Sequence, residues 1–388
     1  MILLALTLTQ IEDWPQWRGP NRDAISQTAI AKWPDKLTPK WKNEVGEGHA
    51  SPIFAAGRIY SFARQNELEI IRALDPATGK QLWQQSYAAP YDMSPPAVPH
   101  GKGPKSTPLF ANGKLYTFGI NGMLACWDAG TGRRLWRHDF KTSPEFGTAM
   151  SPVLHDDLLI VHGGASKLGA LMAFHAATGN VKWMWKDDGA GYSSPVIATV
   201  AGKPQMITQT EKNVIGLNPN DGQLLWKIPF TTAYDQNSVT PVVRGDILIY
   251  SGLDNGVTAV KLTVKGPEQL WQNKSAAMYM NSPVWQGDLV CGLSHKNKGQ
   301  YFCLNATTGK TLWTSPGRQG ENAAMILAGN QILSLDTDGQ LHVIALQDKA
   351  FQEIKKLEAA KSATWAHPAL VPGGILIKDF STLTFYPL

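Results

Sequence analysis

The chain has 388 residues but only three cysteines, Cys126, Cys291 and Cys303, and no two of them are adjacent. It contains no Cys-x-x-Cys sequence, so the haem attachment site and the common thiol redox and zinc motifs are all missing. Cys126 and Cys303 occupy the same position in two sequence repeats, which indicates small buried side chains. Cys291 and Cys303 belong to one repeat unit, and the sequence leaves open whether they form a disulfide.

Catalytic signatures are missing as well. We find no Gly-x-Ser-x-Gly, no His-Glu-x-x-His and no phosphate-binding loop, and the nine histidines are scattered singly. A metal site needs ligands that are held together in a preorganised group, so scattered histidines do not predict one. The sequence therefore predicts no catalytic residue and no metal ligand.

Charged residues are scarce, at 17% of the chain, and the net charge is only +5. No basic run and no interleaving of basic with aromatic residues occurs, which argues against a nucleic-acid partner. Beyond the first residues no apolar stretch approaches the ~20 residues of a membrane-spanning helix. The 36 glycines and 25 prolines, without a long amphipathic helical pattern, are typical of a turn-rich all-β protein.

Residues 1–12 begin Met-Ile-Leu-Leu-Ala-Leu-Thr-Leu, which is similar to the apolar core of a secretory signal. A basic start, an Ala-x-Ala cleavage site and a cysteine that could carry a lipid are all missing from this region. We expect a signal segment and a periplasmic or secreted protein, with a frayed N-terminus as the alternative. Whether the segment is cleaved stays open.

One motif recurs along the chain: an apolar strand that ends in Asp or Asn, a turn through Thr-Gly, and a short strand that ends in Trp. The clear copies lie at residues 73–83, 126–136, 174–183, 216–226 and 303–313, with a degenerate copy at 259–271. Each copy predicts a hairpin in which Asp or Asn accepts hydrogen bonds from the turn, Gly adopts positive φ, and Trp fills space between sheets. The tryptophans at positions 41, 83, 136, 185, 226, 271 and 313 recur every 41 to 53 residues, about the length of a four-stranded propeller blade.

A second marker, a small residue followed by Pro, precedes each predicted first strand. It occurs at Ser51, Thr107, Ser151, Ser194, Thr240 and Ser282, with His367-Pro as a variant and Ala324-Met325 in the remaining slot. The two markers together count eight blades. The last blade, residues 367–388, has room for only three strands, and residues 40–45 can supply the fourth. The sequence thus predicts one all-β domain over residues 40–388: an eight-bladed β-propeller of four-stranded antiparallel blades, closed by pairing the N-terminal strand with the C-terminal blade.

Two segments lie outside this repeat. Residues 13–39 are rich in Trp, Pro and Gly, which predicts an N-terminal wrap over the ring, with Trp14 and Trp17 packed on a face or rim of it. Residues 84–106 form a link that is longer than the other links between blades. A loop of that length is either functional or a cover for apolar surface.

The loops that lead into the inner strands of a propeller gather at one mouth of its channel, so the residues just before each marker should converge there. The candidates for a binding site at this mouth are His49, Lys105, Tyr192, Asp235, Asn237, Asn281, Glu321, Asn322, Trp365 and His367, with Phe146, Gln236 and Tyr279 beside them. Such a polar and aromatic ring could orient a small polar ligand or a peptide segment. Polar side chains and water that merely fill the mouth are the alternative.

The Ala-x-Asp-x-x-Thr-Gly-x-x-x-Trp repeat resembles that of the pyrroloquinoline-quinone-like (quinoprotein-type) eight-bladed propellers, over essentially the whole chain. The opening Trp-Pro-Gln-Trp-Arg-Gly-Pro-Asn-Arg at residues 14–22 is similar to that of BamB-like members. One branch of this family comprises periplasmic dehydrogenases that oxidise alcohols or sugars with pyrroloquinoline quinone (PQQ) and Ca²⁺. The other is shorter and non-enzymatic, and includes the outer-membrane assembly factor BamB. The dehydrogenases typically carry adjacent cysteines against the cofactor, which this chain lacks, so the resemblance favours the BamB-like branch.

The resemblance implies an exported, non-enzymatic scaffold that binds a protein or polypeptide partner as a monomer and needs no cofactor. The alternative is a PQQ-dependent oxidoreductase, with Trp365 or Tyr192 stacking on PQQ, Asp235 or Glu321 as base, and bound Ca²⁺. A third hypothesis is a carbohydrate lyase or hydrolase that uses Glu321 or Asp235 with His367. The separation of its carboxylates cannot be established from sequence.

Overall fold

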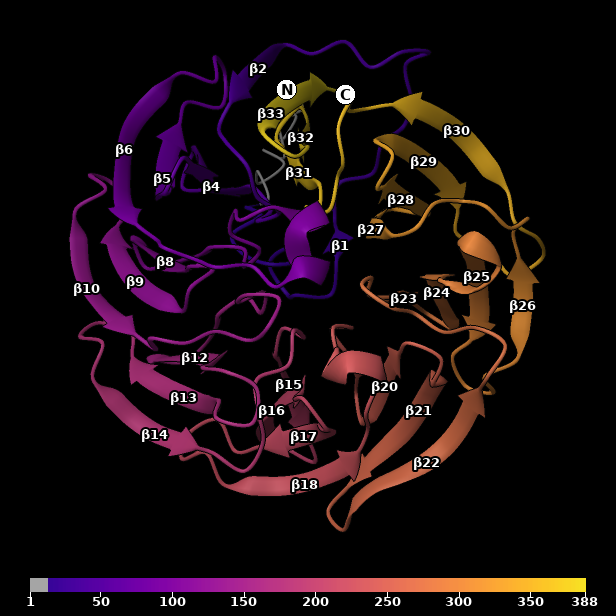
Figure 1. Ribbon diagram of the computed structural model, residues 1–388. Helices are drawn as coiled ribbons and strands as arrows, with labels where there is room; N and C mark the ends of the chain where they lie inside the picture. The colour runs from indigo at the N-terminus through magenta and orange to yellow at the C-terminus, as the bar shows by residue number, and fades with distance from the viewer. Residues whose placement is uncertain (1–12) are drawn as a thin grey trace, which may run out of the picture.

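The computed structural model describes residues 13–388, which form eight β-sheets arranged as blades around a central axis (Figure 1). Seven of the sheets have four strands and one has five. The predicted eight-bladed propeller of antiparallel blades is therefore confirmed. The expected signal segment, residues 1–12, lies outside the described residues.

Each blade runs from an inner strand at the channel to an outer strand at the rim (Figure 1). The strands of the first four blades are β3 (Ile53–Ala55), β4 (Arg58–Gln65), β5 (Leu68–Leu74) and β6 (Gln81–Ala88); β7 (Leu109–Ala111), β8 (Lys114–Phe118), β9 (Met123–Asp128) and β10 (Arg134–Asp139); β11 (Val153–His155), β12 (Leu158–Gly163), β13 (Ala170–His175) and β14 (Val181–Trp185); and β15 (Val196–Val200), β16 (Lys203–Gln209), β17 (Asn213–Leu217) and β18 (Leu224–Pro229).

The last four blades continue the pattern. Their strands are β19 (Val242–Arg244), β20 (Ile247–Gly252), β21 (Gly256–Thr263) and β22 (Gly266–Asn273); β23 (Val284–Gln286), β24 (Leu289–Ser294), β25 (Gln300–Asn305) and β26 (Thr311–Thr314); β27 (Ala323–Ala328), β28 (Gln331–Asp336), β29 (Gln340–Ala345) and β30 (Glu353–Glu358); and β31 (Ala369–Val371), β32 (Gly374–Lys378) and β33 (Thr382–Pro387), joined by β2 (Trp41–Glu44). The links contain three short 3₁₀ helices, η1 (Pro95–His100), η2 (Ala233–Asp235) and η3 (Lys296–Lys298).

The ring closes as the sequence predicts. Strand β2 pairs antiparallel with β33, in the register Trp41 to Phe385 and Glu44 to Thr382. The eighth blade thus takes its outer strand from the beginning of the chain, and two edges that would otherwise be open are paired with each other.

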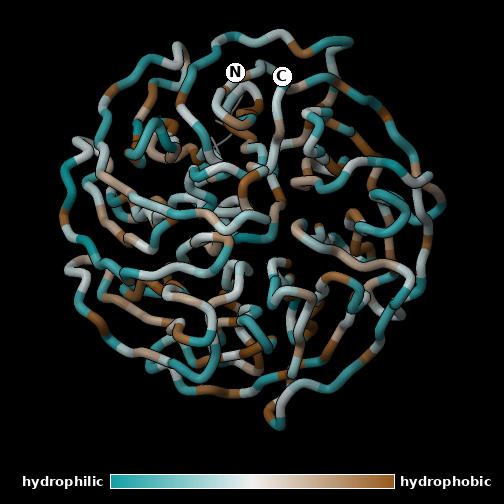
Figure 2. Tube along the Cα trace, in the orientation of Figure 1, coloured by the Kyte–Doolittle hydropathy of each residue, from teal (hydrophilic) through white to brown (hydrophobic). Residues whose placement is uncertain are grey.

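Hydrophobic burial holds the blades together. The middle strands are almost wholly buried, as in β12, whose six residues are all buried, whereas the outer strand β6 is mostly exposed. Figure 2 shows hydrophobic residues recurring along the strands of the blades, with hydrophilic stretches among the peripheral turns. Hydrophobic faces on both sides of a sheet are what a blade needs when it is packed between two neighbours.

The Asp-x-x-Thr-Gly turn forms a tie between neighbouring blades. In the first copy the Asp75 carboxylate accepts from the backbone N–H and the hydroxyl of Thr78, at 2.8 and 2.7 Å. Gly79 has φ +71°, and a Cβ on it would lie 2.7 Å from the Trp41 ring of the preceding blade. The indole Nε1 of Trp41 in turn donates to the carbonyl of Pro76 at 3.0 Å. The turn therefore requires glycine for its conformation and for its contact with the neighbouring indole.

The same indole tie recurs around the ring. Tryptophans 83, 136, 183, 271 and 313 each donate to a carbonyl in or near the corresponding turn of the next blade, at 2.7 to 3.0 Å. The residue that makes this tie in the third blade is Trp183, two positions before the Trp185 used in the sequence count. Trp226 differs, because its Nε1 donates to the Gln205 side chain.

The small-residue–Pro marker has a comparable role at the channel. The Thr107 hydroxyl accepts from the backbone N–H of Ser51 at 3.1 Å, and the Ser151 hydroxyl accepts from the N–H of Thr107 at 3.0 Å. Further bonds of this kind run from Ser151 to Ser194, from Thr240 to Ser282, and from His367 to Ser51. A marker hydroxyl thus joins the starts of neighbouring inner strands, and Ser51 closes the ring from the eighth blade to the first.

The segment before β2 goes deeper than the predicted wrap. Trp14 is 1% exposed and pairs with Phe54 of β3, and β1 (Ile25–Ser26) adds to β27 as a parallel fifth strand of the seventh blade. Trp14 is therefore not a rim residue. Residues 14–26 lie against the inner strands instead of only over them.

Cys291 and Cys303 are directly opposite each other in β24 and β25 and form a disulfide, while Cys126 is unpaired and buried. The pairing that the sequence left open is thereby shown. None of the helices within residues 13–388 has the length and apolar character that crossing a bilayer demands.

Candidate functional site

A cavity of about 510 Å³ lies at the predicted mouth of the channel. It is lined by the residues Trp17, His49, Pro96, His100, Lys105, Glu145, Phe146, Ala149, Tyr192, Ser194, Tyr234, Gln236, Ser238, Thr240, Tyr279, Met280, Ser282 and Trp365. These residues come from links that lead into several different blades. Because Pro96, Glu145 and Tyr234 are exposed, the cavity opens to solvent at this mouth.

The N-terminal segment forms the floor of the cavity. The Trp17 indole donates to the Thr240 hydroxyl at 3.2 Å and meets the His367 ring edge-on at 4.3 Å. Trp17 therefore lies in the channel, contrary to the expectation of a face or rim.

Two buried arginines fasten this floor. The Arg22 guanidinium donates to the carbonyls of Pro195, Pro152 and Ser151, at 2.8, 2.8 and 3.1 Å. Arg18 donates to the carbonyl of Pro283. These carbonyls belong to the small-residue–Pro markers, so the arginines bind the segment to the inner strands of three blades.

One side of the cavity is cationic. Lys105 Nζ donates to the carbonyl of Phe146 at 2.7 Å, and no carboxylate within residues 13–388 forms an ion pair with it. Burial lowers the pKa of Lys105 to about 8, which leaves the ammonium mostly protonated at neutral pH. Behind it, Lys378 is buried and donates to the carbonyls of Gly48, Asp379 and Phe380.

His49 is neutral between these lysines. Burial and the positive charges of Lys378 and Lys105 lower the pKa of His49 to about 3. Its Nε2 lies 2.8 Å from the carbonyl of His100, which can only accept, so Nε2 carries the proton. Burial also lowers the pKa of Lys378 to about 7, and Lys378 does not line the cavity, so the charge on this side comes mainly from Lys105.

The remaining surface of the cavity is largely aromatic. We call Trp17, Phe146, Tyr192, Tyr279 and Trp365 the aromatic wall. The Phe146 and Tyr192 rings meet edge-on at 5.9 Å, and Trp365 lies 4.8 Å from the ring of His100 in η1. In Figure 1, a short helix in the colour of η1 lies across the centre of the ring. The long link at residues 84–106 thus contributes Pro96, His100 and Lys105 to the cavity.

Four of the ten predicted site residues line the cavity: His49, Lys105, Tyr192 and Trp365. Their neighbours Phe146, Gln236 and Tyr279 line it as well. Sequence reasoning did not select Trp17, His100, Glu145 and Tyr234. The surplus length of the 84–106 link was a signal for His100, whereas no local pattern pointed to Trp17.

The other six predicted residues lie outside the lining, and most of them are buried. The Asn237 side chain donates to the carbonyls of Thr210 and Phe230, and His367 lies beneath Trp17. Asn281 and Asn322 are also buried, Asp235 is half-buried in η2, and Glu321 is exposed.

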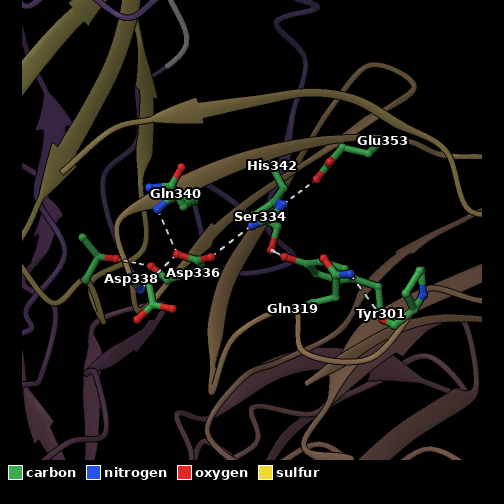
Figure 3. Close-up of polar contacts among 10 residues, drawn as sticks. Tyr301, Gln319, Ser334, Asp336, Asp338, Gln340, His342 and Glu353 are labelled. Carbon is green, nitrogen blue, oxygen red and sulfur yellow. Dashed lines mark hydrogen bonds and ion pairs between the residues drawn. The ribbon is translucent and has the colours of Figure 1, made fainter. Parts of the chain in front are cut away.

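A second polar cluster lies within the seventh blade (Figure 3). His342 is buried, with Nε2 3.0 Å from Asp336 and Nδ1 2.6 Å from Glu353. The nearby Tyr301 hydroxyl lies 2.8 Å from that of Ser334. None of these residues lines the cavity, and the network joins strands of the seventh blade to Tyr301 of the sixth.

The Ca²⁺ of the dehydrogenase branch does not fit these residues. Ca²⁺ takes about six to eight oxygen ligands, carboxylates among them. Glu145 is the one carboxylate among the lining residues, and it is exposed. Across residues 13–388 no group of three or more His, Cys, Asp or Glu side chains could hold a metal ion.

Comparison with known proteins gives the family. The model of the family described as outer membrane protein assembly factor BamB matches residues 67–315, which is well over half of the chain. BamB of Yersinia pestis is 20% identical over 354 residues, which cover 85% of this chain and 84% of that protein.

Two solved structures share the fold. BamB from Moraxella catarrhalis superposes with a TM-score of 0.67 at 16% identity, covering 91% of this chain and 98% of that one. Quinohemoprotein alcohol dehydrogenase from Comamonas testosteroni superposes with a TM-score of 0.71 at 13% identity, covering 97% and 80%. The two fold neighbours come from both branches, whereas the family match selects one. The chain belongs to the BamB family of pyrroloquinoline-quinone-like propellers.

Proposed function

We propose that this protein is an exported, non-enzymatic scaffold that binds a polypeptide partner in outer-membrane protein assembly. The observation that carries the proposal is the match of residues 67–315 to the family of the outer membrane protein assembly factor BamB. The signal-like character of residues 1–12 supports export to the periplasm.

Three strongly exposed apolar side chains support a partner at the mouth face, meaning the face on which the links into the inner strands gather. Val98 in η1 and Tyr234 in η2 are 58% and 80% exposed in two of these links. Leu168, 82% exposed, lies in the turn from β12 to β13, which is on the same face because β11 leaves this face and β12 returns to it. Exposed apolar side chains on one face are typical of protein interaction surfaces.

A deletion strain of the source organism tests the proposal. We expect the amount of β-barrel proteins in its outer membrane to fall and the wild-type gene to restore it. The triple variant Val98→Ser, Leu168→Ser, Tyr234→Ser should fail to restore it, because the variant lacks the apolar contacts of the mouth face.

The matched control is Val264→Ser. Val264 is 90% exposed in the turn between β21 and β22, on the opposite face, so this variant should restore barrel levels. Cell fractionation should place the tagged protein in the periplasm. Cytoplasmic protein, or unchanged barrel levels in the deletion strain, would refute the assignment.

A further inference from the structure

The cavity at the mouth is a blind pocket. Trp17 covers its inner end, and the buried arginines Arg18 and Arg22 hold that segment against the inner strands. Its volume of about 510 Å³ lies within the roughly 300–1,000 Å³ that is typical of small-molecule sites. A ligand can therefore enter from the mouth face and end against the floor.

The charge of the pocket is unbalanced. The Lys105 ammonium has one hydrogen-bond acceptor, the carbonyl of Phe146, and it forms no ion pair with the carboxylates of residues 13–388. An ammonium can donate three hydrogen bonds, and charges withdrawn from water are usually paired. His49 beside it is neutral, and the carboxylate of the lining, Glu145, is exposed. An anionic group is the complement that this side of the pocket lacks.

The rest of the pocket favours an apolar group on the ligand. The aromatic wall offers large apolar faces, on which flat or bulky apolar groups pack favourably. A small inorganic anion would contact Lys105 and leave these faces uncovered. A carboxylate joined to an apolar group would satisfy both.

We propose that the cavity binds a carboxylate attached to an aromatic or similarly bulky apolar group, with the carboxylate at Lys105 and the apolar group against the aromatic wall. Two sources share this chemistry: a free small acid, and the C-terminal residue of a polypeptide. The site shares Tyr234 with the partner surface proposed above, but the two proposals can be tested separately because ligand binding can be measured on the isolated protein.

Matched acids and amides test the proposal on the full chain. The probes are benzoate, indole-3-acetate and N-acetylphenylalanine, each with its amide, observed by saturation-transfer NMR and titrated by calorimetry. A charge-assisted hydrogen bond to a half-buried ammonium should favour the acid by about tenfold to a hundredfold. A pentapeptide that ends in Phe, with a free or amidated C-terminus, separates the two sources. If this peptide also binds only with its carboxylate free, the site accepts a chain terminus, whereas binding of the small acids alone defines a small-acid site.

Lys105→Met keeps most of the length of the side chain and removes its charge, so it should abolish the preference for the acid. Lys102→Met is the control, since Lys102 lies in the same link but outside the lining, and it should keep the preference. Absence of binding by every acid, equal binding of acid and amide, or an unchanged preference in Lys105→Met would overturn the proposal. If Lys105→Met does not fold, the acid and amide comparison on the wild-type protein decides alone.

Discussion

We expect Arg22 to be one of the main residues that hold the N-terminal segment in place at the floor of the cavity. Its guanidinium is buried and donates to three main-chain carbonyls that belong to the third and fourth blades, and to the side chain of Gln16. Replacement by Met keeps an apolar stem and leaves these acceptors without a donor. Each unsatisfied buried acceptor costs about 1–3 kcal/mol, and release of a desolvated cation offsets part of the sum, so we expect a net loss of ~3 kcal/mol.

The expected shift in melting temperature follows from the size of the chain. Unfolding entropy is about 2.1 cal/mol/K per residue, which for 388 residues gives about 0.8 kcal/mol/K. A loss of ~3 kcal/mol therefore lowers the melting temperature by ~4 °C. Differential scanning calorimetry measures this shift. Limited proteolysis followed by mass spectrometry should in addition show faster cleavage within residues 13–39.

Arg22→Lys and Arg133→Met provide the comparison. A lysine ammonium cannot reproduce the planar fork that reaches the carbonyls of two blades, so Arg22→Lys should recover less than half of the loss. Arg133 is exposed in a turn, and its replacement should leave the melting temperature unchanged. An Arg22→Met protein that melts within 1 °C of wild type would show that the floor is held by other contacts.

Three further predictions concern the ring itself. Burial raises the pKa of the Glu69 carboxyl to about 7, above its unfolded value near 4.5. The free energy of unfolding should therefore fall by up to about 3 kcal/mol as the pH rises from 4.5 towards 7. Glu69→Gln should flatten this dependence in urea titrations, and identical pH profiles of variant and wild type would contradict the prediction. Ser51→Ala removes the hydroxyl that accepts a hydrogen bond from the backbone N–H of His367 at 2.8 Å. It should lower the free energy of unfolding by about 1–2 kcal/mol in the same assay. An unchanged urea midpoint would mean that the marker hydroxyls do not hold neighbouring blades together. Reduction of the Cys291–Cys303 disulfide, which closes a loop of 12 residues, should cost about 3 kcal/mol, and the reductant should have no effect on the Cys291→Ala, Cys303→Ala double variant.

The blade count and the closure could be predicted because each marker makes a contact that repeats. Gly79 must pack on Trp41 of the preceding blade, and the Thr107 hydroxyl must reach the N–H of Ser51. A contact repeated at most of the interfaces between blades produces a periodic pattern in the sequence. The same reasoning located the mouth, since the residues before each marker lie where the inner strands begin.

The contacts that form the floor of the cavity produce no periodic pattern in the sequence. The acceptors of Arg22 are main-chain carbonyls more than a hundred residues away, and any residue type can offer a carbonyl. Which of the mouth residues line the cavity has a related explanation. Asn237 lies close to its marker, but its amide turns inward to the carbonyls of Thr210 and Phe230, while Tyr234 of η2 takes the position at the cavity. Backbone at φ +60° for Tyr234 and +53° for Asp235 sets that direction, and nothing in the residue order requires it.

The two kinds of tie also explain why the site lies where the repeats are weakest. The indole ties lie at the turns between the third and fourth strands, on the face opposite the mouth, and the hydroxyl ties lie at the start of each inner strand. Apart from the marker residues at their ends, the links at the mouth take part in neither tie, so their length and composition can change without opening a seam between blades. The 84–106 link uses this freedom to bring Pro96, His100 and Lys105 to the cavity. Because the repeated contacts between blades hold the ring together, ligand recognition depends on the mouth links. The repeats therefore predict the fold of this chain but not its ligand.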